Sequence, residues 1–279
     1  MYNTLKTTFL LGLMTSCFLL AGRELGGDGG MVIALVVAMG SNFVSWWFSD
    51  RIVLAMHRAK EATPESAPRL TAIVAELARR GGLPMPRVYV IPQAAPNAFA
   101  TGRSPSHAAV AVTEGLLRSM DDEQVGAVLA HELGHVARRD TLTMAVAASM
   151  AGALSLLAEL ARWSMIFGGR SRDRRDDGGI GTLVALLLAP FAAMLIQLAI
   201  SRSREFAADA YSAKLMGSPQ PLIRALRALD AGLQHIPSHT PSPAVAHMYI
   251  MSPNDIFGIF RTHPPTEKRI AALLAGEHV

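Results

Sequence analysis

The sequence predicts an α-helical membrane protein with a mostly helical α+β soluble domain that carries a small β-sheet. Hydrophobic residues make up 51% and charged residues only 17% of the 279 positions, and the mean hydropathy is +0.29, which is too apolar for an ordinary soluble protein. Four apolar stretches are long enough to cross a bilayer. Amphipathic helical patterns and short β-branched segments fill much of the remainder, which is typical of a globular α+β unit.

The first two apolar stretches predict a transmembrane hairpin over residues 1–50. Runs 5–22 and 31–48 are joined by the glycine-rich segment GRELGGDGG, and Trp46 and Trp47 near the end of the second run suit a membrane interface. A cleaved signal peptide is the alternative for the first run. The basic residues that follow predict that this end faces the cytosol: Arg51, His57, Arg58 and Lys60.

Residues 51–140 predict the first part of the soluble domain. We expect an amphipathic helix over 66–80, and the segments expected as strands are 87–92, 97–102 and 107–117. A further helix begins near Asp121, which suits an N-cap because Gln124 follows three residues later. Its apolar positions recur at helical spacing and predict a core-facing stripe of Val125, Val128, Leu129, Leu133 and Val136.

The same helix contains the motif HELGH, residues 131–135. Positions i and i+4 lie on one face of a helix, so His131 and His135 can bind one metal ion while Glu132 sits beside them. A catalytic zinc site takes three protein ligands and leaves the fourth position to water. The motif therefore requires a third ligand elsewhere in the chain. The alternative is a helix with two incidental histidines.

Residues 141–200 predict a second transmembrane hairpin, formed by the apolar runs 142–167 and 180–200. The first of these runs contains Glu159 and Arg162, which are costly in hydrocarbon unless they pair or lie near an end. Two crossings return the chain to the side on which it started. A metal ligand beyond residue 200 can therefore reach the two histidines.

Residues 201–279 predict the second part of the soluble domain. A helix over 201–215 places Glu205 and Asp209 four residues apart on one face. Glu205 can bind a metal ion, and Asp209 can accept the ring N–H of a ligand histidine. The alternative is a solvated, charged face of a helix that leaves the membrane, and the spacing does not decide between the two.

Four motifs together resemble the HtpX family of membrane zinc proteases, which is related to the CAAX prenyl proteases. They are NAFATG at 97–102, HELGH, REFAAD at 204–209 and THPPTEKRI at 262–270. The resemblance runs from the N-terminal hairpin to the last of these motifs. It implies a zincin-like fold of the gluzincin type with one Zn²⁺ per chain. The residues implied are His131, His135 and Glu205 as ligands and Glu132 as catalytic base.

The resemblance also implies a location and a role. A multi-pass protein of the bacterial inner membrane is expected, with its active site facing the cytoplasm and with misfolded or damaged membrane proteins as substrates. The lipid bilayer is then a partner. Nucleic acid is not expected, because the net charge of +4 is mild and no base-stacking motif or zinc-finger spacing is present. The single cysteine, Cys17, permits no intrachain disulfide.

Two other functions remain open from the residues. An intramembrane metalloprotease would carry HELGH inside a span, but charged residues flank the motif helix at both ends. A catalytically silent membrane scaffold would not need an intact motif and a distal glutamate. His263 and Arg269 are candidates to stabilise the oxyanion of an acyl-transfer reaction; a turn histidine and a structural salt bridge are the respective alternatives.

The segment NAFATG is rich in small side chains, which let another backbone approach closely. If it forms an exposed sheet edge, it can bind an extended peptide through main-chain hydrogen bonds. The alternative is that Phe99 packs in the core and that the segment is structural.

Overall fold

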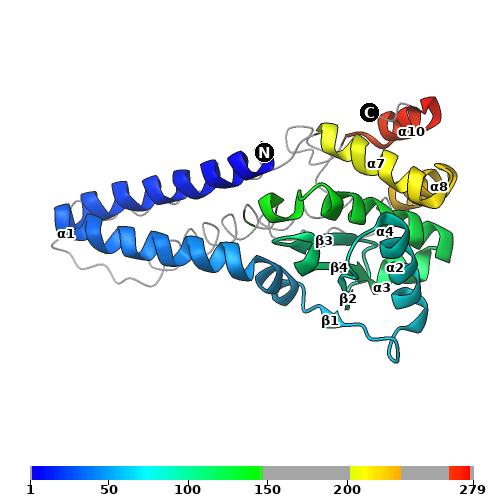
Figure 1. The fold of residues 1–279 in the computed structure, drawn as a ribbon, viewed down its shortest axis with the longest axis horizontal. Coiled ribbons are helices and arrows are strands. Elements are labelled where there is room, and N and C mark those ends of the chain that lie inside the picture. Colours follow the sequence, from blue (N-terminus) through cyan, green and yellow to red (C-terminus); the bar gives the residue numbers. More distant parts are fainter. Residues whose placement is uncertain (1, 145, 147–201, 234–263, 277–279) are drawn as a thin grey trace, which may run out of the picture.

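The computed structural model describes residues 2–144, 146, 202–233 and 264–276. Residues 147–200 of the expected second hairpin, and His263, lie outside the described residues. The described chain forms an elongated helical hairpin joined to a compact α+β unit (Figure 1).

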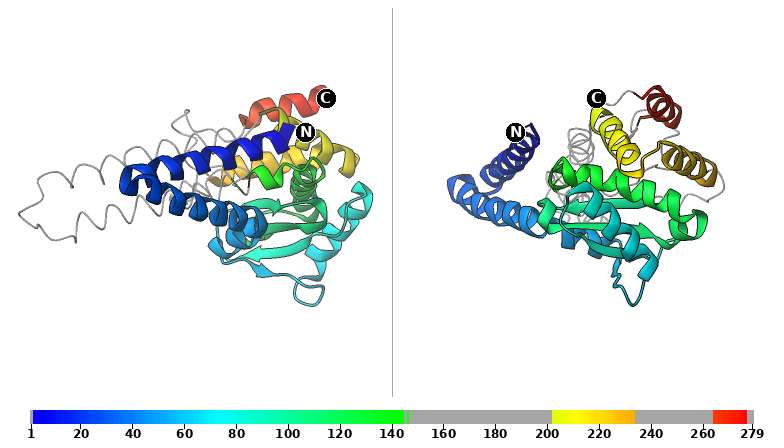
Figure 2. Two further views of the ribbon diagram at one scale, coloured as in Figure 1. Left: turned by 60° about the vertical axis from the view of Figure 1, so that its left-hand side comes forward. Right: turned by 45° about the vertical axis from the view of Figure 1, so that its right-hand side comes forward.

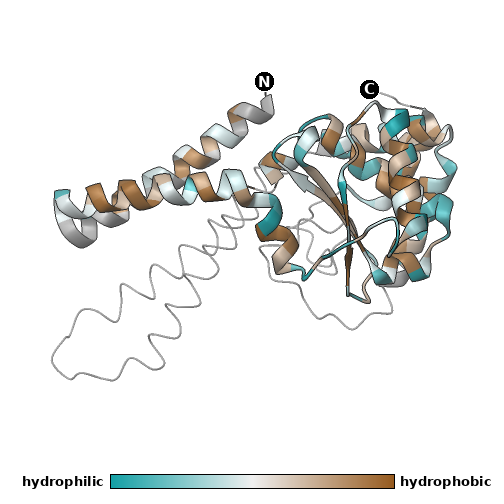
Figure 3. Ribbon diagram, turned by 60° about the horizontal axis from the view of Figure 1, so that its bottom comes forward, coloured by the Kyte–Doolittle hydropathy of each residue, from teal (hydrophilic) through white to brown (hydrophobic). Residues whose placement is uncertain are grey.

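Helix α1 (Tyr2–Met56) consists of two antiparallel arms (Figure 1). The Asn42 amide donates hydrogen bonds to the Leu11 carbonyl at 3.3 Å and to Thr15 Oγ1 at 2.8 Å, although a straight helix would hold these groups about 40 Å apart. Gly27 has a left-handed φ of +59°, and this glycine lies in the segment where a turn was expected. The portion Gly27–Met56 is long and apolar enough to cross a membrane, and apolar residues line its length (Figure 3).

The sheet has four strands in the order β1-β2-β4-β3, with bounds Lys60–Glu61, Arg87–Ile91, Ala108–Thr113 and Ala98–Gly102. β2 and β4 are parallel, whereas β1 and β3 each run antiparallel to their single neighbour. The expected strands at 87–92 and 97–102 are confirmed to within one residue. β1 was not predicted, because two residues are too few to show an alternating pattern.

The expected strand over 107–117 is wrong in its second half. β4 ends at Thr113, and helix α3 (Glu114–Ser119) follows directly. The Thr113 hydroxyl accepts hydrogen bonds from the backbone N–H of Leu116 and from that of Asn97. It therefore caps the helix and fastens the strand end at the same point, and the apolar residues beyond it pack as one helical turn rather than as strand.

The two faces of the sheet are covered by different elements (Figure 2). Helices α2 (Pro68–Gly81) and α4 (Asp122–Ala137) share the main hydrophobic core with one face. The C-terminal end of α1 covers the other face, where Val53 and Leu54 pack against Tyr89, Ile91 and Phe99. The sheet is therefore attached directly to the hairpin arm that carries the apolar span.

Helix α4 is buried from Val125 to Val136. The sheet lies on one side of it, and α7 (Arg202–Met216), α8 (Gln220–Leu233) and α10 (Thr266–Ala275) lie on the other (Figure 2). The expected Asp121–Gln124 capping box is present, and the expected core stripe is buried. The residues of HELGH are buried as well, because α7 covers the face that would otherwise be open.

The contact between α4 and α7 depends on Gly134. A Cβ at this position would lie 3.1 Å from Cα of Ala208 and 3.3 Å from Cβ of Tyr211. The Ser212 hydroxyl donates a 2.7 Å hydrogen bond to the Ala127 carbonyl two turns away. Glycine at 134 thus lets the two helices approach more closely than a Cβ at this position would allow without a shift of α7.

We predict that Gly134→Ala lowers the free energy of unfolding by about 1–3 kcal/mol, because the added methyl group must push α7 away from α4. Gly126→Ala is the matched control on the same helix. Its Cβ would meet only side-chain atoms at 3.5 Å or more, so it should leave stability unchanged or raise it by about 0.5–1 kcal/mol. Denaturant unfolding in detergent measures both, and equal effects of the two substitutions would contradict the close-approach argument.

Candidate metal centre

His131 and His135 lie one turn apart on α4 and meet Glu205 from the first turn of α7. Nε2 of His131 is 3.6 Å from Oε2 of Glu205, and Nε2 of His135 is 3.6 Å from Oε1 of the same carboxylate. All three side chains are buried, and their ligand atoms lie within 4.8 Å of one another. The structure therefore brings together the three residues expected as ligands.

The arrangement fits a zinc ion. Two ligands that each lie about 2.1 Å from one tetrahedral ion are about 3.4 Å apart, which is close to both measured separations. Nε2 of His131 is buried and has no hydrogen-bond partner within the described part of the chain. An orphaned buried nitrogen is costly unless a ligand satisfies it. Two histidines and one carboxylate are also a common donor set of catalytic zinc.

A buried carboxylate and a buried guanidinium group support His131. Nδ1 of His131 lies 2.8 Å from Oδ1 of Asp209, and Arg269 from α10 donates to both oxygens of that carboxylate, at 2.6 and 2.8 Å. Burial alone would raise the pKa of Asp209, but Arg269 and then His131 lower it to about 2. The ionised Asp209 holds the proton of His131 on Nδ1, so that Nε2 presents its lone pair to the metal position.

The structure contains the salt bridge that was the alternative to an oxyanion role of Arg269. Its guanidinium group is buried and its Nε and Nη2 donate to Asp209, as the structural salt bridge requires. Burial alone would lower the pKa of Arg269, but Asp209 raises it.

His135 has an equivalent support that the sequence analysis missed. Arg139, just past the end of α4, adopts a left-handed φ of +59°, and the backbone N–H of Asp140 donates to the His135 carbonyl. This turn places Oδ2 of Asp140 3.4 Å from Nδ1 of His135, and Arg204 approaches the other oxygen at 3.5 Å. The only sequence signal is an aspartate five residues after the second histidine, which no helical spacing would select.

Glu132 is held by the edge strand of the sheet. The backbone N–H of Ala100 in β3 donates a 2.9 Å hydrogen bond to Oε2 of Glu132. In an antiparallel pair, the backbone N–H and C=O groups of alternate residues point toward and away from the neighbouring strand. Those of Ala100 and Gly102 point away from β4. The Gly102 carbonyl accepts a 2.8 Å hydrogen bond from the Thr141 hydroxyl. β3 is an edge strand, but all five of its residues are buried and Phe99 packs in the core against α1, as the structural alternative for NAFATG expected. The contact of this segment with Glu132 was not anticipated.

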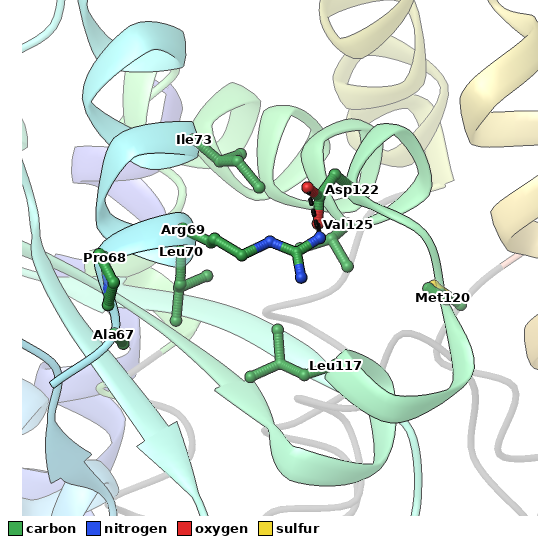
Figure 4. A pocket seen from close by; sticks show the side chains of 9 residues that line it. All are labelled: Ala67, Pro68, Arg69, Leu70, Ile73, Leu117, Met120, Asp122 and Val125. Carbon is green, nitrogen blue, oxygen red and sulfur yellow. Dashed lines mark hydrogen bonds and ion pairs between the residues drawn. The ribbon is translucent and has the colours of Figure 1, made fainter.

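A cavity of about 320 Å³ lies apart from these residues, between α2, α3 and the N-terminal end of α4 (Figure 4). Its lining is mainly apolar, apart from Arg69 and Asp122, which form an exposed ion pair at 2.7 Å. Asp122 and His131 are nine residues apart on α4, or about 13 Å along the helix axis. The cavity does not belong to the metal centre.

Comparison with known proteins agrees with this geometry. A model of peptidase family M48 matches residues 64–277. The chain belongs to peptidase family M48. The protease HtpX homolog of Desulforapulum autotrophicum is 51% identical, with 99% of this chain and 91% of the relative covered. The homolog of Persephonella marina is 49% identical, with 97% and 96% covered. The expected resemblance to HtpX proteases is thus confirmed.

A solved structure shows the same fold. The chain superposes on Ste24p from S. mikatae with a TM-score of 0.51 at 21% identity, over 98% of this chain and 64% of Ste24p. This chain therefore spans less than two thirds of Ste24p, and the similarity concerns the fold alone.

Charge is unbalanced at the centre of this M48 peptidase. The buried acidic groups around it are Glu132, Asp140, Glu205 and Asp209, and the buried or nearly buried guanidinium groups are Arg204 and Arg269. Among the described residues, four carboxylates thus stand against two guanidinium groups, and a divalent cation would balance this excess of acidic groups. Burial lowers the pKa of His135, but Glu205, Asp140 and Glu132 outweigh it and raise that pKa to about 9. When no metal is bound, a proton on His135 thus supplies part of the positive charge that a cation would provide.

We predict that Glu205→Ala removes most of the bound zinc, because two histidines alone leave the site one ligand short. Glu114→Ala, which removes an exposed glutamate paired with Arg118, is the control and should keep one zinc per chain. Metal analysis after gel filtration measures both. Full zinc occupancy in Glu205→Ala would exclude Glu205 as the third ligand.

We also predict that zinc binding at pH 7 releases about one proton from His135. The pKa of His135 is raised from 6.5 to about 9 without metal. The ring is therefore protonated below pH 9, and the proton must leave before Nε2 can bind. Apparent zinc affinity should increase with pH up to about 9. Calorimetry in buffers of different ionisation enthalpy counts the protons, and zinc binding without proton release at pH 7 would contradict the prediction.

Proposed function

We propose that this M48 peptidase is a membrane-anchored, zinc-dependent endopeptidase that cleaves misfolded or damaged membrane proteins. The observation that carries the proposal is the convergence of His131, His135 and Glu205 around the orphaned Nε2 of His131, with Glu132 directly adjacent on α4. Three protein ligands beside a carboxylate that is no ligand itself are the arrangement of a metal-dependent peptide hydrolase.

The chemistry assigned to the chain centres on Glu132. Zinc bound at the site would supply a Lewis acid that activates water and polarises the scissile carbonyl. Glu132 takes the proton of the attacking water and delivers it to the leaving amine. The backbone N–H of Ala100 fixes the orientation of the Glu132 carboxylate, while Asp209 and Asp140 fix the tautomers of the two histidines. Arg269 is assigned to holding Asp209, and an oxyanion role of His263 stays a proposal.

The two rival functions are less well supported. An intramembrane protease would expose the motif helix to lipid, whereas α4 lies between the sheet and α7 and begins with exposed Asp122 and Glu123. A silent scaffold would gain nothing from an unsatisfied buried nitrogen in an enclosed cluster of carboxylates, because each such group destabilises the fold.

The cellular setting belongs to the same proposal. We infer that residues 1–50 and 141–200 form two transmembrane hairpins, and that the parts 51–140 and 201–279 share the cytosolic side of a bacterial inner membrane. The apolar length of Gly27–Met56 and the basic residues after it support this orientation. Both ligand-bearing segments must lie on one side of the bilayer to form a single site.

We predict that Glu132→Gln keeps the fold and one zinc per chain but lowers turnover of an unfolded membrane-protein substrate at least about 100-fold, because the amide cannot accept the proton of water. Glu123→Gln on the same helix removes an exposed carboxylate paired with Arg224 and is the matched control. Gel-based cleavage assays in liposomes compare the two. Near-normal turnover by Glu132→Gln would rule out the proposed base, and no turnover by wild-type protein of any unfolded substrate would refute the protease function.

A further inference from the structure

The turn after β3 is joined to the membrane hairpin by a cation–π contact. The guanidinium carbon of Arg103 lies 4.3 Å from the ring centroid of Trp47 on α1, well within the range of a favourable contact. Trp47 itself belongs to an aromatic cluster. Its ring stacks on Phe43 at 6.0 Å and meets Trp46 at 5.5 Å. We call Phe43, Trp46, Trp47 and Arg103 the aromatic clamp.

The aromatic clamp faces outward. Phe43, Trp46 and Trp47 are 56%, 37% and 40% exposed, although large aromatic side chains in a soluble protein would be expected to pack inside. They lie in the half of the apolar portion Gly27–Met56 that leads to the α+β unit. Aromatic residues at the end of an apolar span sit at headgroup depth in a bilayer. Exposed rings at this place therefore fit lipid headgroups better than water.

Exposed basic side chains follow the aromatic clamp along the chain. Arg51 lies over the ring of Phe48 one turn further along α1, and Arg58 and Lys60 follow; all three basic residues are exposed. The nearby Asp50 carboxylate is buried and paired with Arg87. This surplus of basic side chains at the end of an apolar span attracts the phosphate groups of anionic lipids.

The clamp is also close to the catalytic groups along one strand. Arg103 follows Gly102, the last residue of β3, and is three residues from Ala100, or about 10 Å of extended chain. Ala100 holds Glu132, and Gly102 is fastened by Thr141. The sheet edge beside the metal centre is therefore connected to a side chain at headgroup depth by a short, rigid segment.

We propose that the aromatic clamp binds anionic phospholipid headgroups and holds the β3 edge at the bilayer surface. The enzyme would then cleave peptide bonds in the extended segments that lie directly beside the transmembrane spans of its substrates. This inference rests on the proposed function and adds to it the part of a membrane protein that is cut. A segment far from the bilayer gains nothing from the clamp, because it reaches the site as a free chain in water.

The position of the clamp can be measured without any activity. In the zinc-loaded full-length protein with Cys17 replaced by serine, a fluorophore is attached at Ser106→Cys beside the clamp or at Gln220→Cys. Both positions are exposed, and α8, which begins at Gln220, lies at the opposite end of the molecule from the turn of α1 (Figure 1). The vesicles contain phosphatidylcholine with or without phosphatidylglycerol and carry nitroxide quenchers on the headgroup.

We expect the label at 106 to be quenched several times more strongly than the label at 220. If both are quenched equally, the clamp does not lie at the bilayer surface and the proposal is wrong. Loss of the difference in Arg103→Ala would support the role of the arginine, and loss of quenching when phosphatidylglycerol is omitted would support anionic lipid as the partner. If neither Arg103→Ala nor the omission of phosphatidylglycerol changes the quenching, the assignment of the clamp to anionic headgroups is wrong.

Cleavage tests the substrate assignment. A single-span protein in the same vesicles carries one cleavable segment either directly beside the span or behind a Gly/Ser linker of about 30 residues, which moves it about 30 Å away on average. Arg103→Ala should lower kcat/KM for the near segment about fivefold, the size expected for one lost cation–π contact. Arg103→Ala should cut the far segment with the same kcat/KM as the control variant Arg118→Ala, in which an exposed arginine of α3 is removed.

An equal loss on both segments, or no loss on either, would overturn this inference while leaving the protease function intact. If wild-type protein cuts neither segment, the proposed function fails, and the quenching experiment still decides where the clamp lies.

Discussion

The metal centre is assembled by the close approach of α7 to α4, which Gly134 permits. His131 and His135 come from one helix and Glu205 from the other, and about seventy residues of chain separate them. The spacing of the two helices therefore sets how closely the Glu205 carboxylate approaches both imidazoles. The apolar packing of α8 and α10 against the same pair of helices holds this distance. The close packing of these helices and the geometry of the metal centre therefore depend on each other.

The free-energy cost of burying charge explains which residues surround the two histidines. Each histidine has a carboxylate at Nδ1, and each carboxylate is approached by an arginine: Asp209 by Arg269 and Asp140 by Arg204. A carboxylate buried without such a partner would be strongly destabilising. In the part of the chain that the structure describes, the acidic groups still outnumber the arginines at the centre, which favours a divalent cation and, in its absence, a proton on His135. The same excess of acidic groups would favour a bound divalent cation and raises the pKa of His135.

The sheet links the site to the hairpin. One face of the sheet supports α4, and the other rests on the C-terminal end of α1. The edge strand β3 contacts both systems, because Ala100 holds Glu132 and Arg103 meets Trp47. The orientation of the candidate metal centre relative to the hairpin is therefore fixed by a short element, β3 and the turn that follows it.

The sequence by itself determined the features that depend on local spacing. The i,i+4 pairs His131–His135 and Glu205–Asp209, the Asp121 cap and the core stripe of α4 follow from helix geometry alone, and the apolar runs follow from hydropathy. Tertiary structure decided the rest, because those contacts join residues with no periodic relation. Asp140 reaches His135 only through a left-handed Arg139, and α3 replaces strand only because the Thr113 hydroxyl caps it. The bond from Ala100 to Glu132 and the contact of Arg103 with Trp47 join separate elements, and such pairs are fixed by packing rather than by any pattern along the chain.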